Sequence, residues 1–263
     1  MKVSYYPGCT LKNRAKELDF YARRCAELLG VTLEEIENWQ CCGGAFTTGR
    51  DEVATKLSSV RALKAAQDKG EPLVTVCSAC HNVIKQTNHA VQTDPAFADK
   101  VNRYMAEDGS YGGECTVYHY LELLRDVIGF DKVREKVTNP LKGKKIGAYY
   151  GCLLLRPGSV MKLDDPENPS VMEELIKALG AEPCRFANRN ECCGGYVMAK
   201  DPESARKKSL DIMNNAIAAG AEMIVTACPL CKYNLEKSGS PLPVVYFTEL
   251  LAEALGVKEE ASE

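Results

Sequence analysis

The stretch Leu73-Val-Thr-Val-Cys-Ser-Ala-Cys80 joins a short run of apolar and β-branched residues directly to a Cys-x-x-Cys turn. The same arrangement returns in the second half of the chain as Ile224-Val-Thr-Ala-Cys-Pro-Leu-Cys231. Each apolar run predicts a buried strand, so each Cys-x-x-Cys follows the end of a strand. Parallel α/β sheets hold their ligands at the carboxyl ends of strands, and we therefore expect a ligand site at both places.

The repeat extends upstream of both turns. Each turn is preceded by a Cys-Cys-Gly-Gly segment, Cys41–Gly44 in the first copy and Cys192–Gly195 in the second, with 34 residues between the second cysteine of the pair and the turn. A single cysteine lies further upstream, at the end of Lys2-Val-Ser-Tyr-Tyr-Pro-Gly-Cys9 and of Lys145-Ile-Gly-Ala-Tyr-Tyr-Gly-Cys152. The spacing to the Cys-Cys pair is 31 residues in the first copy and 39 in the second. Two long copies predict a pair of similar domains rather than a solenoid.

Strand patterns alternate with helical patterns in both copies, which is typical of an α/β fold. We expect two similar domains related by pseudo-two-fold symmetry, each with a small, largely parallel sheet flanked by helices. The turn-rich segment 138–144 is the best boundary, giving a first domain over 1–140 and a second over 141–263. The expected helices each stop at a glycine, and Asp51 is the expected N-cap of the second. They cover Asp19–Leu29, Asp51–Lys69, Val171–Leu179 and Pro202–Ala219.

Composition narrows the class of protein. The chain has 263 residues, 45% of them hydrophobic, and a formal net charge of −3. There is no basic excess for nucleic-acid binding, no secretory signal, and no apolar run long enough to cross a membrane, so we expect a cytoplasmic protein without membrane insertion. In a reducing cytosol, thirteen cysteines indicate metal ligation or redox chemistry rather than disulfides.

Ten of the cysteines form two sets of five. The first cysteine set is Cys9, Cys41, Cys42, Cys77 and Cys80, and the second cysteine set is Cys152, Cys192, Cys193, Cys228 and Cys231. Five thiols exceed the four that a zinc site or a cubane cluster requires. Adjacent side chains diverge, so the members of a Cys-Cys pair suit two different metal atoms of a polynuclear iron–sulfur centre better than one ion. Two structural zinc sites remain the alternative.

Glycines follow each Cys-Cys pair, and we assign them to cofactor binding. They are Gly43, Gly44, Gly194 and Gly195. Because glycine lacks a Cβ, the backbone can bend tightly and approach an inorganic cluster closely. Its N–H groups can then donate to sulfide, which tunes the reduction potential.

These residues resemble the CCG domain (cysteine-rich domain) family, whose long motif both copies satisfy completely over almost the whole chain. Within the family, the resemblance is greatest to the B subunits of heterodisulfide reductases. It implies that each cysteine set ligates one noncubane [4Fe-4S] cluster, described as fused [3Fe-4S] and [2Fe-2S] units. It also implies a catalytic subunit that reduces a small disulfide, CoM-S-S-CoB in a methanogen, to two thiols between two such clusters.

The chain has neither a ferredoxin-type cysteine run nor a G-x-G-x-x-G fingerprint, so electrons must arrive from other subunits. The resemblance implies two partners from the same complex, a ferredoxin-like protein (its C subunit) and a flavin-containing protein (its A subunit). A hydrogenase or formate dehydrogenase module is a further candidate partner. Two alternatives stay open. The chain is an electron-transfer subunit of another oxidoreductase of the lactate, glycerol-3-phosphate or succinate/fumarate type, or it is a structural zinc scaffold.

Other residues have simpler interpretations. We expect Cys25, Cys115 and Cys184 to be buried thiols rather than ligands. We interpret His81 as a helix-start residue, with donation to a substrate thiolate as the alternative, and we assign no catalytic role to His89 or His119.

Basic and aromatic residues near the motifs are further candidates. An anionic disulfide needs Arg or Lys in its pocket, and the candidates close to motif cysteines are Lys12, Arg14, Arg50, Arg156, Lys200 and Lys232. The tyrosines before the first cysteine of each copy are expected to serve in strand packing, with cluster shielding as a lesser role. They are Tyr5, Tyr6, Tyr149 and Tyr150.

Overall fold

The computed structural model describes residues 1–44 and 53–258, and it confirms an α/β fold with two four-stranded sheets in which every strand pair is parallel. The first sheet has the order β2-β1-β3-β4 and the second has the order β6-β5-β7-β8. The strands of the first sheet are β1 (Lys2–Tyr6), β2 (Thr32–Glu35), β3 (Leu73–Thr75) and β4 (Val117–His119). Those of the second sheet are β5 (Lys145–Tyr149), β6 (Glu182–Cys184), β7 (Met223–Thr226) and β8 (Val244–Tyr246). The duplication seen in the sequence is thus a duplication of topology.

Helices flank both sheets. Those of the first half are α1 (Gly8–Asn13), α2 (Lys16–Leu28), the 3₁₀ turn η1 (Ala54–Lys56), α3 (Leu57–Asp68), α4 (Ser78–Thr93), α5 (Pro95–Tyr104), α6 (Tyr120–Glu122), the π-helical turn η2 (Leu123–Ile128) and α7 (Phe130–Lys136). Those of the second half are α8 (Gly158–Met161), α9 (Val171–Ala178), α10 (Pro202–Ala218), α11 (Pro229–Glu236) and α12 (Phe247–Leu255). None of these helices, taken over the described residues, combines the length and the apolar composition that a membrane span requires.

The expected helices are present, with shifts at their starts. The first begins three residues before Asp19, whereas the second is described only from Ala54, and its expected N-cap Asp51 lies outside the described residues. The expected stop at Gly70 is confirmed, because this residue has a φ of +67°, which ends a helix readily in glycine.

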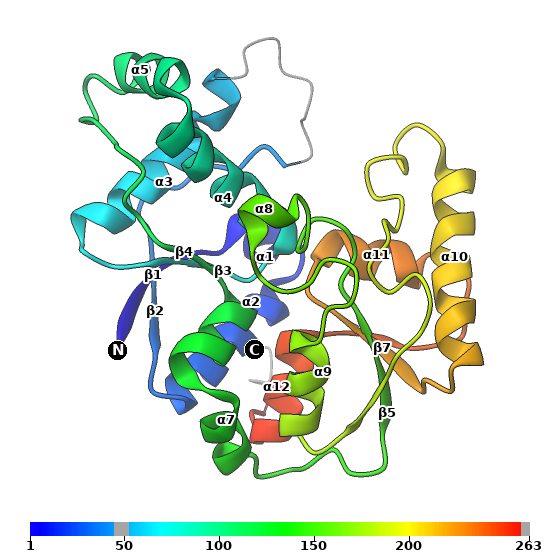
Figure 1. Cartoon of the computed structure of the whole chain (residues 1–263). Coiled ribbons are helices and arrows are strands. Elements are labelled where there is room, and N and C mark those ends of the chain that lie inside the picture. Colours follow the sequence, from blue (N-terminus) through cyan, green and yellow to red (C-terminus); the bar gives the residue numbers. More distant parts are fainter. Residues whose placement is uncertain (45–52, 259–263) are drawn as a thin grey trace.

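The two halves exchange helices. Helix α12, which follows the last strand of the second sheet, packs on α2 of the first half. Helix α7, which follows the last strand of the first sheet, packs on α9 of the second half. Figure 1 shows these four helices gathered between the two sheets. One continuous core therefore runs through both halves, and the predicted division at residue 140 stays a prediction.

A small hydrogen-bonded junction joins the carboxyl ends of β3 and β7. The hydroxyl of Tyr246 lies 2.8 Å from the carbonyl oxygen of Val76 and 2.9 Å from that of Ala227, the residues directly before the two Cys-x-x-Cys turns. Ser78 donates its backbone N–H to Ala227 O at 3.1 Å and its hydroxyl to the same oxygen at 2.6 Å. Since buried carbonyls require donors, these bonds hold the two turns next to each other.

His119 completes the junction as a neutral side chain. Its Nε2 lies 3.0 Å from Val76 O, and its Nδ1 accepts the backbone N–H of Leu121 at 3.2 Å, which fixes the tautomer with the proton on Nε2. Burial disfavours the charged form and lowers the pKa of His119 to about 3. The unfolded side chain titrates near 6.5, so between about pH 3 and 6.5 only the unfolded state holds the extra proton. The unfolding free energy therefore falls as pH is lowered through this range and is unaffected above it.

Replacing His119 by Asn tests this assignment, because Asn can still cap α6 but cannot take up a proton. Between about pH 7.5 and about pH 5, we expect the unfolding free energy of the natural chain to fall by about 2 kcal/mol more than that of the His119→Asn variant. Chemical denaturation at the two pH values measures both falls. Equal falls in the two chains would show that His119 does not bind its proton selectively in the unfolded state.

Candidate functional site

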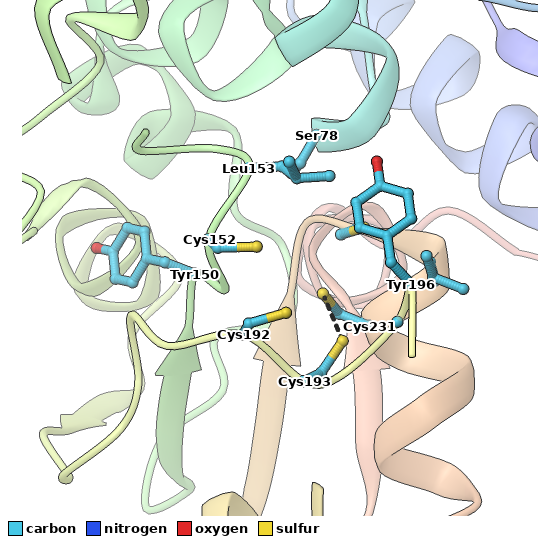
Figure 2. Close-up of a pocket in the computed structure, with 11 residues that line it drawn as sticks. Ser78, Tyr150, Cys152, Leu153, Cys192, Cys193, Tyr196 and Cys231 are labelled. Atoms are coloured by element: carbon cyan, nitrogen blue, oxygen red, sulfur yellow. Dashed lines mark hydrogen bonds between the residues drawn. The ribbon is translucent and has the colours of Figure 1, made fainter. Parts of the chain in front are cut away.

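All five thiols of the second cysteine set line one pocket. The pocket lies beyond the carboxyl ends of β5 and β7 and beside the loop that leads toward α10 (Figure 2). Its other lining residues are Ser78, Tyr150, Leu153, Gly195, Tyr196 and Leu230. The sulfurs of Cys193 and Cys231 are 3.5 Å apart, and the side chain of Cys192 lies next to that of Cys152 (Figure 2). The structure thus brings together all five residues that the sequence assigned to this set.

The first cysteine set has the same internal pairing. The sulfur of Cys41 lies 3.5 Å from that of Cys9, and the sulfur of Cys42 lies 3.5 Å from that of Cys80. Cys77 occupies the N-cap position of α4, whose first turn carries Cys80. In both sets, then, the first member of the Cys-Cys pair meets the single strand-end cysteine and the second meets the last cysteine of the Cys-x-x-Cys turn. Adjacent cysteines therefore serve different partners, as two metal atoms would require.

The two sets meet at the junction between β3 and β7. Cys77 of the first set and Cys228 of the second set lie near enough to influence each other's ionisation. Their interaction raises the pKa of Cys77 and contributes to a pKa of Cys228 well below the ordinary value. Because the hydrogen bonds of Tyr246 and Ser78 hold the same strand ends, their proximity is a fixed part of the fold.

Crowding controls the ionisation of these thiols. Hydrogen bonds from Cys152 and then Cys193 lower the pKa of Cys192 to about 2, and the pKa of Cys193 is raised to about 12 because its thiol donates to Cys192. In the first set, donation by Cys41 and then Cys80 lowers the pKa of Cys42 to about 3. One thiolate is stabilised only while its neighbours stay protonated. Full ionisation of five sulfurs needs positive charge among them, and metal ions supply it.

The spread of the sulfurs bears on the kind of metal centre. A structural zinc ion takes four ligands at about 2.0–2.3 Å from one point. Over residues 1–44 and 53–258, no group of three or more His, Cys, Asp or Glu side chains is arranged to hold one metal ion. Five thiols around one pocket fit a centre with several metal atoms better than a single tetrahedral ion.

Glycine is required where the backbone passes close to the sulfurs. A Cβ on Gly8 would lie 2.8 Å from the sulfur of Cys80, and a Cβ on Gly151 would lie 3.2 Å from that of Cys231. Both glycines have positive φ, +78° and +64°, which other residues rarely adopt. The sequence assignment missed this pair, although the Gly-Cys sequence at the end of both repeats signals it.

The four predicted glycines also lie against the cysteines or the helices behind them. Gly194 N donates to the sulfur of Cys192 at 3.3 Å, and a Cβ on Gly195 would lie 2.7 Å from Leu230. A Cβ on Gly44 would lie 3.4 Å from the sulfur of Cys42, whereas Gly43 has a φ of +74°. The tight backbone is therefore present, and the cofactor-binding role of these glycines stays a prediction.

Two tyrosines do more than fill the strands. Tyr6 donates its hydroxyl hydrogen to Gln40 O at 2.6 Å, and Tyr149 donates to Glu191 O at 2.7 Å. Each acceptor directly precedes a Cys-Cys pair, so the end of the strand is tied to the loop that carries the pair. Tyr150 is buried too, and its hydroxyl donates to Glu173.

The other sequence candidates lie apart from the pocket. Cys25 and Cys115 are buried as expected, while Cys184 is only partly buried, with its sulfur 2.9 Å from Ala219 O. His81 is fully buried with Nε2 3.2 Å from Glu122 Oε2, and it does not line the pocket.

The expectation of basic pocket residues is not met at the second set. None of the five basic candidates that the structure describes is among the residues lining the pocket, and Arg50 lies outside the described residues. Lys12, Arg156 and Lys232 are instead paired with the carboxylates of Glu35, Glu167 and Glu236. The described side chains that line the pocket are mainly thiol, aliphatic and aromatic. Such a lining suits the sulfur atoms of a bound molecule better than an anionic group attached to them.

Comparison with known proteins shows which protein family shares the two cysteine-containing repeats. The sequence profile described as "Cysteine-rich domain" (CCG) matches residues 3–85 and 146–236. The chain is 32% identical over 267 residues to the 8-methylmenaquinol:fumarate reductase membrane anchor subunit of Wolinella succinogenes, spanning 97% of this chain and 93% of that protein. It is 28% identical to the B subunit of the ferredoxin/F(420)H(2)-dependent CoB-CoM heterodisulfide reductase of Methanosarcina acetivorans, spanning 97% of this chain and 89% of that one. A protein of Archaeoglobus profundus, described as similar to the B subunit of heterodisulfide reductase, is 29% identical over 99% of this chain and 92% of its own.

Among solved structures, a hypothetical protein from Helicobacter pylori has the same fold. It superposes with a TM-score of 0.76 at 12% sequence identity, covering 98% of this chain and 49% of that chain. At this identity the likeness concerns the fold alone.

The close approach at Gly8 gives a test of the site geometry. We expect Gly8→Ala to lower the unfolding free energy by about 1 kcal/mol or more beyond the loss in Gly70→Ala, measured by chemical denaturation. Both positions have positive φ, but a Cβ on Gly70 meets nothing within 4 Å, so the difference isolates the clash with Cys80. Equal losses in the two variants would mean that the backbone does not approach the sulfur this closely.

Proposed function

Because the chain belongs to the cysteine-rich domain (CCG) family, we propose that it is the catalytic iron–sulfur subunit of a heterodisulfide-reductase-like complex. The relatives named above are subunits of oxidoreductases, which supports a redox, electron-transfer role. The proposed reaction is the reduction of a disulfide, CoM-S-S-CoB or a related one, to two thiols. The observation that carries the proposal is the placement of two complete five-cysteine sets at one junction, where Ser78 and Tyr246 bond the strand ends before both Cys-x-x-Cys turns.

We propose that each cysteine set holds one noncubane [4Fe-4S] cluster. The donor set fits, because five soft thiolates converge on a pocket that contains no compensating cation among its described residues. Such clusters supply one-electron transfer. The chain contributes the thiolates, the glycine-bounded space between them and the fixed separation of the two sets.

The geometry suits a two-electron cleavage. Breaking a disulfide takes two electrons and yields two sulfurs that each need a stabilised place. The junction of Cys77 with Cys228 brings two one-electron sites together, so the two sulfurs of one small molecule lie within reach of both sets. The largely apolar lining at Leu153 and Leu230 limits water, which strengthens electrostatic interactions there.

Partner proteins complete the proposal. We propose that electrons arrive from a ferredoxin-like protein and a flavin-containing protein, the C and A subunits of the same complex. A hydrogenase or formate dehydrogenase module is a further donor. The names of the relatives, which describe parts of larger reductases, support an assembly of this kind.

A second candidate function changes the substrate and keeps the clusters. The 32% identity to a subunit of an 8-methylmenaquinol:fumarate reductase favours an electron-transfer subunit in a complex of that type. In that case the paired sets form a conduit, and the disulfide is not a substrate.

An assay of the purified complex separates the two candidates. With reduced viologen as electron donor, we expect CoM-S-S-CoB or another small disulfide to be consumed, with two thiols formed per disulfide. Free thiols are counted with a chromogenic reagent, and fumarate is offered in parallel. Reduction of fumarate without reduction of any disulfide would select the second candidate.

Metal analysis tests the cofactor proposal. After anaerobic purification, we expect about eight iron and about eight sulfide per chain. The variant Cys193→Ser should lose about half of both, because Cys193 is a buried member of the second set, whereas Cys184→Ser should lose none. A preparation that contains zinc and no iron would establish the structural zinc scaffold instead.

A further inference from the structure

Tyr196 is the pocket residue whose function the cysteine pattern does not explain. It follows Gly195 directly, lines the same pocket as the second cysteine set, and is 42% exposed. Figure 2 shows its ring along one side of the pocket, with the hydroxyl directed toward the end where Ser78 and Leu153 lie. The ring therefore borders both the sulfurs and solvent.

The hydroxyl of Tyr196 differs from those of the other tyrosines around the two sets. Tyr6, Tyr149, Tyr150 and Tyr246 all donate their hydroxyl hydrogens to protein acceptors. The hydroxyl of Tyr196 has no hydrogen-bond partner among the described residues. Within the described part of the chain, this donor is therefore left to solvent or to a ligand in the pocket.

The pocket places this hydroxyl beside both cysteine sets, because Tyr196 lines it together with the second set and with Ser78, the residue that follows Cys77 of the first set. Burial raises the pKa of Tyr196 to about 12, and nearby cysteines of both sets add to the rise. The phenol thus keeps its proton at neutral pH and presents a hydrogen-bond donor where both sets can be reached.

We propose that Tyr196 donates a hydrogen bond to the sulfur of an organic thiolate or disulfide bound between the two cysteine sets. The inference deepens the proposed function and rests on it. When the S–S bond breaks, two electrons from the external donor leave one negative charge on each sulfur, and the Tyr196 hydroxyl stabilises one of these charges. Tyr196 keeps its own proton, and the two protons of the product thiols come from water. The donor acts as oxyanion-hole donors do, with sulfur in place of oxygen.

The two halves are unequal at this position. In the first copy, the residue that follows the second glycine is Ala45. At this position only the second half has a hydroxyl, and the difference makes the two sulfurs of one disulfide chemically distinct. An unsymmetrical disulfide would bind in one orientation for this reason.

Binding of 2-mercaptoethanesulfonate to the anaerobic complex tests the inference by calorimetry. We expect Tyr196→Phe to weaken binding of this thiol about tenfold, because a donor to a charged sulfur is lost. Binding of its S-methyl thioether should not change, because that sulfur carries no charge. The matched control is Tyr233→Phe, since Tyr233 is 51% exposed on α11 and does not line the pocket. Its affinity for the thiol should equal that of the natural chain.

A second variant separates hydrogen bonding from packing. Tyr196→Gln places an N–H donor at the site without the ring, and we expect it to bind the thiol more tightly than Tyr196→Phe. If Gln binds as weakly as Phe, the ring alone matters and the inference is overturned. Iron content and circular dichroism equal to those of the natural chain confirm that each variant folds and is loaded.

The outcomes separate the inference from the proposed function. Equal dissociation constants for the natural chain and Tyr196→Phe overturn the inference, whether or not the complex reduces disulfides. Weaker thiol binding in Tyr196→Phe supports the inference, even if the complex reduces no disulfide and the proposed function fails. In a complex that does reduce disulfides with viologen, kcat/KM should also fall at least about tenfold in Tyr196→Phe and remain unchanged in Tyr233→Phe.

Discussion

The hydrogen bonds from Tyr246 to the carbonyl oxygens of Val76 and Ala227 are the interaction on which the arrangement of the molecule depends. Both acceptors are the last residues before a Cys-x-x-Cys turn, and one hydroxyl serves them together. The distance between the two cysteine sets is therefore set by buried hydrogen bonds to the backbone directly before each turn. Two cofactors held by the two cysteine sets would be kept at this distance from each other. The same distance would limit the size of a molecule bound between them.

Symmetry at this junction is close but incomplete. The first turn has Ser78, whose N–H and hydroxyl both donate across the junction, where the second turn has Pro229, which has no N–H to return the bond. His119 stands in the place that Tyr246 occupies in the other copy, and both reach Val76 O. The segment between the single cysteine and the Cys-Cys pair is longer in the second copy. It includes α8, which packs on α4 of the first half. The five-cysteine pattern is thus present twice, while the groups around it differ between the two copies.

The sequence predicts the grouping of the cysteines and the sheet class well, because cysteine spacing and strand patterns are local properties. The ten cysteines converge as the motif implied, and the strand before each Cys-x-x-Cys is where the apolar runs placed it. The short edge strands β2 and β6 are not predicted, since Thr32–Glu35 and Glu182–Cys184 carry little β signal and gain their pairing from a neighbouring strand. The roles of Tyr246 and Tyr196 could not be read locally either, because they depend on which distant backbone or thiol each hydroxyl approaches.

The exchange of α12 and α7 between the halves has a consequence for how the chain acquires its structure. The apolar side of α2, which includes Leu18, Ala22 and Ala26, is covered by a helix near the end of the chain. During synthesis that side stays uncovered until α12 has left the ribosome, even though the rest of the first sheet is already complete. The first half therefore completes its packing only after the second half has been synthesised. A single copy of the repeat would lack the helix that covers α2 here, so the duplication contributes to packing as well as to the number of cysteines.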